Sequence, residues 1–98
     1  MHICLNNDAH ESVGGMPTGA VGQDFYKVAE KCGYRYAVCV DNMEDLIEEL
    51  KKAKSQKGPV FLEIKVKIGA RADLGRPKET AVENRDNFMS YHFHESAE

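Results

Sequence analysis

The sequence has no long apolar run and no excess of basic residues. Its longest strongly apolar stretch is Val60 to Leu62, which is far too short to span a bilayer or to form the core of a signal peptide. The net charge is -3 and acidic and basic residues are interleaved, so we expect no basic face that binds nucleic-acid phosphates or anionic lipid. These absences argue against nucleic-acid and membrane partners and predict a soluble, cytoplasmic protein.

The cysteines also lack a pattern. There are three of them, Cys4, Cys32 and Cys39, an odd number without the spacing of a metal site. Each lies among apolar neighbours, so the sequence predicts buried, reduced thiols rather than a disulfide framework.

Strand and helix patterns alternate along the first half of the chain. The apolar run from Ile3 to Leu5 predicts a buried strand that ends at Asn6 and Asn7. Residues 8–23 contain Pro17 and half of the glycines, which predicts a long irregular loop. Residues 24–32 have apolar side chains at helical spacing, followed by Gly33 as a C-terminal cap.

The second half continues the alternation. Residues 36–40 predict a buried strand, and Asn42 can cap a helix that Gly58 and Pro59 stop. Residues 60–68 predict a third strand, apolar at first and then alternating, with Glu63, Lys65 and Lys67 on a partly solvated face. After a loop over residues 69–78, Thr80 and Glu83 have the spacing of a capping box. That box would open a last helix, with Val82, Phe88 and Met89 as its apolar residues and a tail that frays from His92.

This order of elements, β-α-β-α-β-α, predicts an α/β fold with parallel strands joined by right-handed crossovers. The 98 residues are enough for one small domain or for part of a larger one. An all-parallel sheet needs both faces covered, and three strands with three helices leave edges unprotected. We therefore expect residues 1–98 to be a parallel-sheet fragment, about half of a doubly wound domain.

Ligands of open parallel sheets bind beyond the carboxyl ends of the strands, which here points to residues 6–22. Glycines allow the backbone to approach a phosphate closely, and the Asn6-Asn7 pair offers hard oxygen ligands for magnesium, with Asp8 as a candidate carboxylate. Magnesium would need further ligands from elsewhere. From these residues alone an ordinary loop and turn remain open alternatives.

Two separated blocks resemble one family. Residues 5–18 read Leu-Asn-Asn-Asp-Ala-His-Glu-Ser-Val-Gly-Gly-Met-Pro-Thr, and residues 69–77 read Gly-Ala-Arg-Ala-Asp-Leu-Gly-Arg-Pro, followed by Val82-Glu83-Asn84. The first block is similar to the closing half of the thiamine diphosphate motif, whose opening Gly-Asp-Gly half is absent from this sequence. Together the blocks resemble thiamine diphosphate-dependent 2-oxo acid decarboxylases, and among them phosphonopyruvate decarboxylases.

The resemblance implies that the chain is the C-terminal part of a diphosphate-binding domain, with thiamine diphosphate and Mg²⁺ as cofactors. Met16 stands where relatives often carry Gln, which leaves a polar role at that position in doubt. The implied site residues are Asn7 and the main chain of Ala9 on the metal, Gly14 and Gly15 beside the diphosphate, His10, Glu11 and Ser12 in catalysis, and Arg71 and Arg76 on the substrate anion.

The resemblance further implies that phosphonopyruvate is converted to phosphonoacetaldehyde on the way to aminoethylphosphonate. Active sites of this family lie between subunits of an oligomer, and we find neither a pyrimidine-binding domain nor its activating glutamate here. The isolated chain is therefore expected to be inactive without the remainder of the enzyme or a partner subunit. The alternatives are a sulfopyruvate decarboxylase or related subunit, since sulfonate and phosphonate need similar donors, and a noncatalytic assembly module.

Overall fold

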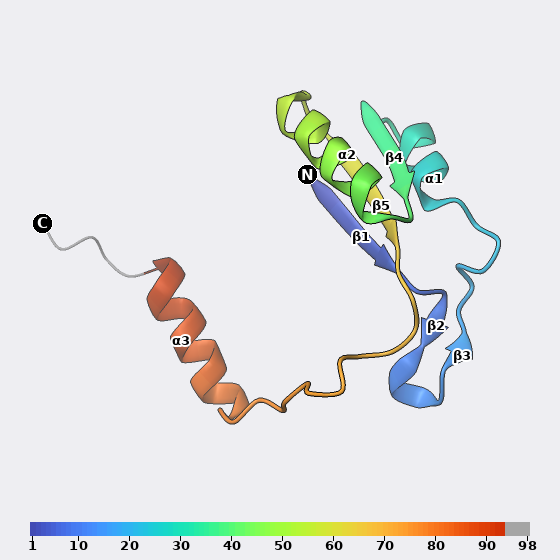
Figure 1. The fold of residues 1–98 in the computed structure, drawn as a ribbon. Coiled ribbons are helices and arrows are strands. Elements are labelled where there is room, and N and C mark those ends of the chain that lie inside the picture. The colour runs from blue at the N-terminus through green and yellow to red at the C-terminus, as the bar shows by residue number, and fades with distance from the viewer. Residues whose placement is uncertain (94–98) are drawn as a thin grey trace, which may run out of the picture.

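The computed structural model describes residues 1–93, and its centre is a three-stranded parallel sheet (Figure 1). The strands stand in the order β1-β5-β4, and every neighbouring pair is parallel. The predicted α/β class with a parallel sheet is confirmed. The three strands are β1 (His2–Asn6), β4 (Tyr36–Val40) and β5 (Val60–Lys65).

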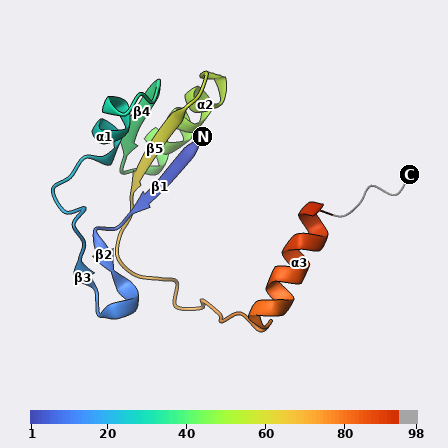
Figure 2. The ribbon, with the colours of Figure 1, turned by 180° about the vertical axis from the view of Figure 1, so that it is seen from behind.

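The two helices between these strands lie on opposite faces of the sheet (Figures 1 and 2). The chain moves from β1 across to β4 through α1 (Phe25–Lys31) and returns to β5 through α2 (Met43–Ser55). Because crossovers of this kind are right-handed, reversing the direction of travel places the second helix on the other face. Phe61 and Glu63 of β5 face α1, and Ile64 faces α2, as expected from alternation along a strand.

The core is built around β5 because it is the central strand. Leu62 is 0% exposed, and its neighbours Val60 and Phe61 are also buried. Full burial of such a side chain contributes about 1.5–3 kcal/mol. The remaining buried apolar residues of the core come from the loop, the helices and β4, and are Ala20, Ala29, Val40 and Ala53.

The first strand is exposed, although the sequence predicted a buried one. Ile3 and Leu5 are both exposed, Leu5 by 69%. The strand lies at the edge of the sheet, and the main contacts of α1 and α2 with the sheet are to β4 and β5. Beneath α1 the sheet also keeps an apolar hollow of about 360 Å³, lined in part by Cys4, Val28 and Phe61. Three strands with two helices cannot cover both faces, and β1 is the strand left open.

The strand β5 ends at Lys65, three residues before the predicted end. Lys65 is paired with Asn6, the last residue of β1. After a final hydrogen bond of 3.0 Å from the Val66 amide to the Asn6 carbonyl, no ladder partner from β1 remains for the chain. Residues 66–68 alternate like a strand, but alternation without a neighbouring strand does not make one.

The helix ends follow the predicted capping signals. The Asn42 side chain accepts a hydrogen bond of 2.9 Å from the Asp45 amide at the start of α2. Thr80 and Glu83 form the reciprocal bonds of a capping box, with distances of 2.7 and 3.2 Å, before α3 (Ala81–Phe93). Gly33 has a φ of 100° after α1, a conformation that glycine adopts readily. These three predictions are confirmed.

The predicted irregular loop over residues 8–23 contains a small antiparallel hairpin. Its strands are β2 (Ala9–His10) and β3 (Met16–Pro17), and between them lies the 3-10 turn η1 (Glu11–Val13). Gly14 and Gly15 close the turn with φ values of 87° and 72°. Strands of two residues are too short to produce an alternating pattern, which explains why the sequence predicted none.

The chain beyond β5 leaves the sheet as an extended connector that leads to α3 (Figures 1 and 2). Every residue from 66 to 93 is exposed, including the predicted apolar residues Val82, Phe88 and Met89. Predicted fraying from His92 is wrong for His92 and Phe93, which are helical, and residues after 93 lie outside the described part. None of the described helices has the length and apolarity needed to cross a membrane.

The cysteines are free thiols, as predicted, but they are not all buried. Cys4 and Cys39 are half-buried, whereas Cys32 is exposed. Burial, followed by the negative charge of Glu63, raises the pKa of the Cys4 and Cys39 thiols. Cys32 is exposed because it follows the last turn of the short helix α1.

Candidate functional site: the turn after the first strand

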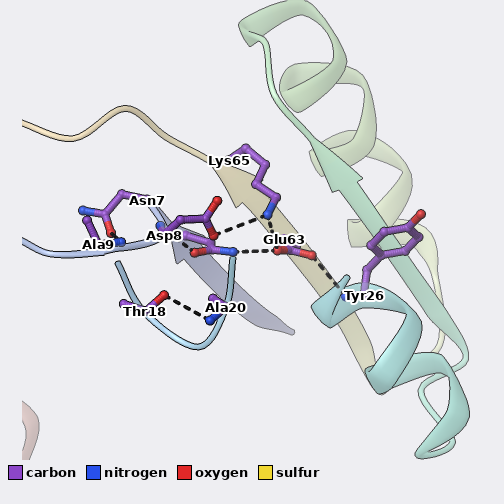
Figure 3. A network of polar contacts seen from close by, with 9 residues as sticks. Asn7, Asp8, Ala9, Thr18, Ala20, Tyr26, Glu63 and Lys65 are labelled. Atoms are coloured by element: carbon purple, nitrogen blue, oxygen red, sulfur yellow. Dashed lines mark hydrogen bonds and ion pairs between the residues drawn. The ribbon is translucent and has the colours of Figure 1, made fainter. Parts of the chain in front are cut away.

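The candidate site is the turn that connects β1 to the hairpin, where the carboxyl ends of β1 and β5 lie side by side (Figure 3). Asn6 is buried at the end of β1, and Asn7, Asp8 and Ala9 are half-buried. The loop behind them closes where the Thr18 hydroxyl accepts a 3.1 Å hydrogen bond from the Ala20 amide. The turn therefore lies at the edge of the sheet where a parallel α/β fold binds ligands.

Two consecutive asparagines shape this turn through their own backbone. Asn6 Oδ1 accepts a hydrogen bond of 3.0 Å from the Asp8 amide, and Asn7 Oδ1 accepts one of 3.0 Å from the Ala9 amide. Asp8, between them, has a φ of 57°, in the left-handed region that asparagine and aspartate tolerate better than most residues. The pair thus specifies a tight reversal immediately after the strand.

The hairpin register directs the main chain of Ala9 toward the Asn7 side chain. Ala9 lies opposite Pro17, and the Thr18 amide donates to the Asp8 carbonyl at 2.9 Å. This is the pattern of a non-hydrogen-bonded antiparallel pair, in which the N–H and C=O of Ala9 both point away from β3. The N–H reaches Asn7 Oδ1, and the carbonyl faces the same side.

An amide oxygen and a main-chain carbonyl on one side of a turn are hard ligands of the kind that Mg²⁺ accepts. Asn7 and Ala9 therefore fit the metal role that the sequence resemblance implies for them, as two of the six ligands. Among residues 1–93 no group of three or more His, Cys, Asp or Glu side chains gathers as a metal site. The other ligands would be a local carboxylate or oxygens from outside these residues.

Asp8 is the local candidate carboxylate, and its Oδ1 is buried without a hydrogen bond within the described chain. The nearest cation is Lys65, whose Nζ lies 3.7 Å from that oxygen. This distance suits an ion pair but exceeds a hydrogen bond.

Glu11 contacts the turn directly. Its Oε1 accepts a 2.6 Å hydrogen bond from Asn7 Nδ2 and a 2.9 Å hydrogen bond from the Gly69 amide. The same oxygen thus joins the Asn7 side chain to the first part of the connector. The predicted catalytic role of Glu11 stays a prediction, whereas its contact with Asn7 is direct.

The other predicted residues of the first block surround the hairpin. His10 and Ser12 are exposed, and within residues 1–93 the His10 imidazole makes no hydrogen bond or ion pair. Gly14 and Gly15 lie at the tip of the hairpin, where a Cβ on either glycine would meet nothing within 4 Å. The structure brings Glu11 to Asn7 but leaves His10 and Ser12 facing solvent.

The predicted substrate arginines lie on the connector. Arg71 is exposed and pairs with Asp73 at 3.5 Å, and Arg76 is also exposed. Arg71 follows Gly69 by two residues, so the Glu11 contact holds the start of the connector beside the turn. Among the described residues, neither arginine makes a hydrogen bond or ion pair with the turn.

Sequence reasoning missed the polar network beneath the turn. Glu63, assigned to a solvated face, is 0% exposed. Its carboxylate accepts hydrogen bonds from Asn6 Nδ2 at 3.0 Å and from the Tyr26 amide at 3.2 Å, and Lys65 Nζ lies 3.4 Å away (Figure 3). A carboxylate directly after the most apolar run of the chain was the signal that could have revealed it.

The charges of this network act on Lys65. Burial lowers the pKa of the Lys65 ammonium, but the charge of Glu63, the hydrogen bond to it and the charge of Asp8 together raise that pKa above its ordinary value. Lys65 is therefore a cation that joins the buried carboxylate to the turn.

Comparisons with known proteins point to one family. The sequence model of the family described as "Thiamine pyrophosphate enzyme, C-terminal TPP binding domain" matches residues 1–64. A phosphonopyruvate decarboxylase of Streptomyces viridochromogenes is 33% identical over 91 residues, which cover 93% of this chain and 23% of that protein. Another, of Streptomyces hygroscopicus, is 36% identical over 78 residues, covering 80% of this chain and 20% of that protein. The chain thus spans about a fifth of the length of these relatives, and no solved structure matches it.

Proposed function

The chain belongs to the thiamine pyrophosphate enzymes, within their C-terminal cofactor-binding domain, and from this premise we propose that it is part of a decarboxylase that converts phosphonopyruvate to phosphonoacetaldehyde and carbon dioxide. One observation carries the proposal. A match over 91 of the 98 residues leaves out at most seven, so it includes residues 8–91 and with them both the hairpin and the arginines of the connector.

In this proposal the turn after β1 holds magnesium and, through it, the cofactor diphosphate. Asn7 Oδ1 and the Ala9 carbonyl supply two oxygen ligands, and the backbone at Gly14 and Gly15 lies close to the diphosphate. The Asn7 oxygen already accepts the Ala9 N–H at 3.0 Å, and an amide oxygen has a second lone pair for a metal. Residues 1–98 would then form the C-terminal portion of the cofactor-binding domain.

The bound thiamine diphosphate would supply the electron sink for the pair released when carbon dioxide leaves. The protein must then deliver a proton to the carbon that lost the carboxylate. His10 is our first candidate for that transfer, because an imidazole can both donate and accept a proton and this one is exposed next to the turn. Glu11 orients Asn7 through its 2.6 Å hydrogen bond, and Ser12 adds a hydroxyl.

Arg71 and Arg76 are our candidates for binding the substrate anion. A guanidinium binds phosphonate or sulfonate oxygens through paired N–H donors, so the arginines alone do not choose between the two substrates. The relatives' name favours phosphonopyruvate. Comparing kcat/KM for phosphonopyruvate and sulfopyruvate with the complete enzyme tests this choice, and a preference for sulfopyruvate would overturn it.

The proposed partner is the remainder of the enzyme, which supplies the Gly-Asp-Gly half of the motif and the pyrimidine-binding domain. It is either further sequence of the same polypeptide or a separate subunit, in a homo-oligomer with sites between subunits. A cytoplasmic location stays a prediction. Alone, the 98 residues should bind thiamine diphosphate and Mg²⁺ weakly or not at all, since two metal ligands do not fill an octahedral shell. Tight binding by calorimetry would contradict this.

The decisive experiment removes the Asn7 oxygen in the complete enzyme. We expect Asn7→Ala to raise the magnesium concentration for half-maximal thiamine diphosphate binding by roughly tenfold or more, because a direct ligand is lost. Calorimetry at a series of magnesium concentrations measures this. Asn87→Ala, in the exposed helix α3, is the matched control and should change nothing. Unchanged magnesium dependence in Asn7→Ala would overturn the assignment of the turn.

A further inference from the structure

Glu63 is the most deeply buried charged residue of the described chain. It lies in the middle of the central strand β5, on the face that α1 covers, and is 0% exposed. A carboxylate in such a place is costly unless every oxygen is paired. Here each oxygen has a partner: Oε1 accepts from the Tyr26 amide at 3.2 Å, and Oε2 from Asn6 Nδ2 at 3.0 Å with Lys65 Nζ at 3.4 Å.

We propose that Glu63 is a positioning residue that fixes the turn after β1 in the shape that binds the metal and the cofactor diphosphate. The statement that this shape binds the metal and the cofactor, the cofactor half of the inference, rests on the proposed function. The structural half, the link from Glu63 to the turn, stands on the contacts alone.

Two paths lead from the Glu63 carboxylate to the turn (Figure 3). The first runs through the Asn6 side chain, whose Nδ2 donates to Glu63 and whose Oδ1 accepts from the Asp8 amide. The second runs through Lys65, whose Nζ lies between Glu63 Oε2 and Asp8 Oδ1, at 3.4 and 3.7 Å. Both paths end at Asp8, the residue with a positive φ between the two proposed metal ligands.

The three groups around Glu63 are all donors, which explains why the position needs a carboxylate. An ionised carboxylate is an acceptor only, so it satisfies an amide N–H, an amide NH₂ and an ammonium at once. A glutamine of the same shape would turn its own NH₂ toward one of these donors. Glu63→Gln therefore removes one acceptor for these donors and keeps the volume of the side chain.

A reciprocal exchange tests the link specifically. In Asn6→Asp/Glu63→Gln the glutamine NH₂ can donate to the new aspartate, whose other oxygen can still accept from the Asp8 amide, and Lys65 keeps Asp8 as its carboxylate partner. Glu63→Gln should thus damage the turn, and the double variant should restore it. General destabilisation of the sheet would give no such recovery.

The first measurement is hydrogen exchange of the Asp8 and Ala9 amides in the complete enzyme without cofactor. These amides donate to Asn6 Oδ1 and Asn7 Oδ1, so their exchange reports directly on the turn. We expect Glu63→Gln to accelerate both by about tenfold or more relative to amides in the middle of α2, consistent with an unpaired buried donor. The double variant should return them to within about threefold of the wild type.

The second measurement is the magnesium concentration for half-maximal thiamine diphosphate binding. We expect Glu63→Gln to raise it by roughly 10- to 100-fold, as for residues that support metal ligands, and the double variant to recover most of the loss. The control is Leu62→Ala, whose side chain is equally buried but faces α2. It should lower overall stability and leave the magnesium dependence unchanged.

Three results would overturn the inference. One is unchanged exchange at Asp8 and Ala9 in Glu63→Gln, and another is a double variant as impaired as the single one. If Glu63→Gln does not fold, Lys65→Met decides instead, because it interrupts the second path at a half-buried side chain; no acceleration at Asp8 would count against the link. If the wild type binds no cofactor with magnesium, the proposed function and the cofactor half fail together, and the exchange data still decide the structural half.

Discussion

Two parts of the chain differ in the interactions that stabilise them. They are the sheet region, residues 1–65, and the C-terminal arm, residues 66–93. The sheet region contains all the buried residues of the described chain, whereas every residue of the arm is exposed. The family match, residues 1–64, coincides with the sheet region. The sheet region is thus stabilised by tertiary packing, and the arm depends on local interactions.

Local interactions in the arm are few but well formed. The capping box at Thr80 and Glu83 begins α3, and the rings of Phe88 and His92 lie 4.3 Å apart one turn from each other. A helix of 13 residues without tertiary packing is marginal in water. We therefore expect α3 to respond to changes at its cap, and the sheet region to respond to changes in its core.

The largest effect should come from emptying the core. Leu62→Ala should lower the free energy of unfolding by about 2–5 kcal/mol, because it leaves a cavity in the central strand. Phe88→Ala, on the exposed face of α3, should change it by less than about 0.5 kcal/mol. Urea denaturation followed by circular dichroism measures both. Comparable losses would mean that α3 packs against the sheet in solution.

A smaller effect is expected from the cap of α2. Asn42 Oδ1 accepts from the Asp45 amide at 2.9 Å, so Asn42→Ala should cost about 1 kcal/mol of unfolding free energy. Because α2 packs on the sheet, this loss should appear in the global transition. Asn87→Ala, in the interior of α3, is the control without a cap to lose. If both variants unfolded like the wild type, the Asn42 cap would contribute nothing.

The equivalent change in the arm should stay local. Thr80→Ala removes the hydroxyl that accepts from the Glu83 amide at 3.2 Å, so the population of helix in residues 81–93 should fall. Since no described residue of the arm is buried against the sheet region, the unfolding midpoint of that region should not move. Backbone chemical shifts report the helix population residue by residue. A shifted global midpoint would refute the separation of the two regions.

The smallest effect is a dependence of α3 on pH. Hydrogen bonds from Thr80, first from its backbone amide, lower the pKa of the Glu83 carboxyl. A lowered pKa in the folded state means that the cap is at full strength above the ordinary glutamate pKa and weakens as the pH falls through the folded value. The chemical shifts of α3 should therefore lose helical character as the pH falls below the ordinary glutamate pKa. Glu83→Gln should abolish this dependence, and its persistence would point to another group.

Most of the regular elements were predictable because they follow from local patterns. The Asn42 cap and the Thr80 capping box each depend on residues three positions apart, and each was predicted at the correct place. The exposure of β1 was not predictable, because the apolar run at residues 3–5 reads the same in a central strand and in an edge strand. Strand order decides burial, and strand order is not local.

The candidate site also has one part that local sequence predicts and one part that depends on strand order. Its position at Asn6 and Asn7 was predicted from the end of a strand and from the family motif. The support beneath it was not, because Glu63 and Asn6 are 57 residues apart and meet only through the parallel pairing of β1 with β5. Alternation placed Glu63 on a solvated face, and α1 covers that face.

Two hydrogen bonds from backbone amides join the two regions, one from the Val66 amide to the Asn6 carbonyl and one from the Gly69 amide to Glu11 Oε1. The second is made by an oxygen that also accepts from the Asn7 side-chain amide. This single carboxylate oxygen of Glu11 therefore links the hairpin to the start of the connector. If the start of the arm moved away by more than the length of a hydrogen bond, either the bond from the Gly69 amide to Glu11 would break, or Glu11 and the Asn7 side chain would move with it. The orientation of the Asn7 side chain is therefore coupled, through Glu11, to the position of the chain that leads to α3.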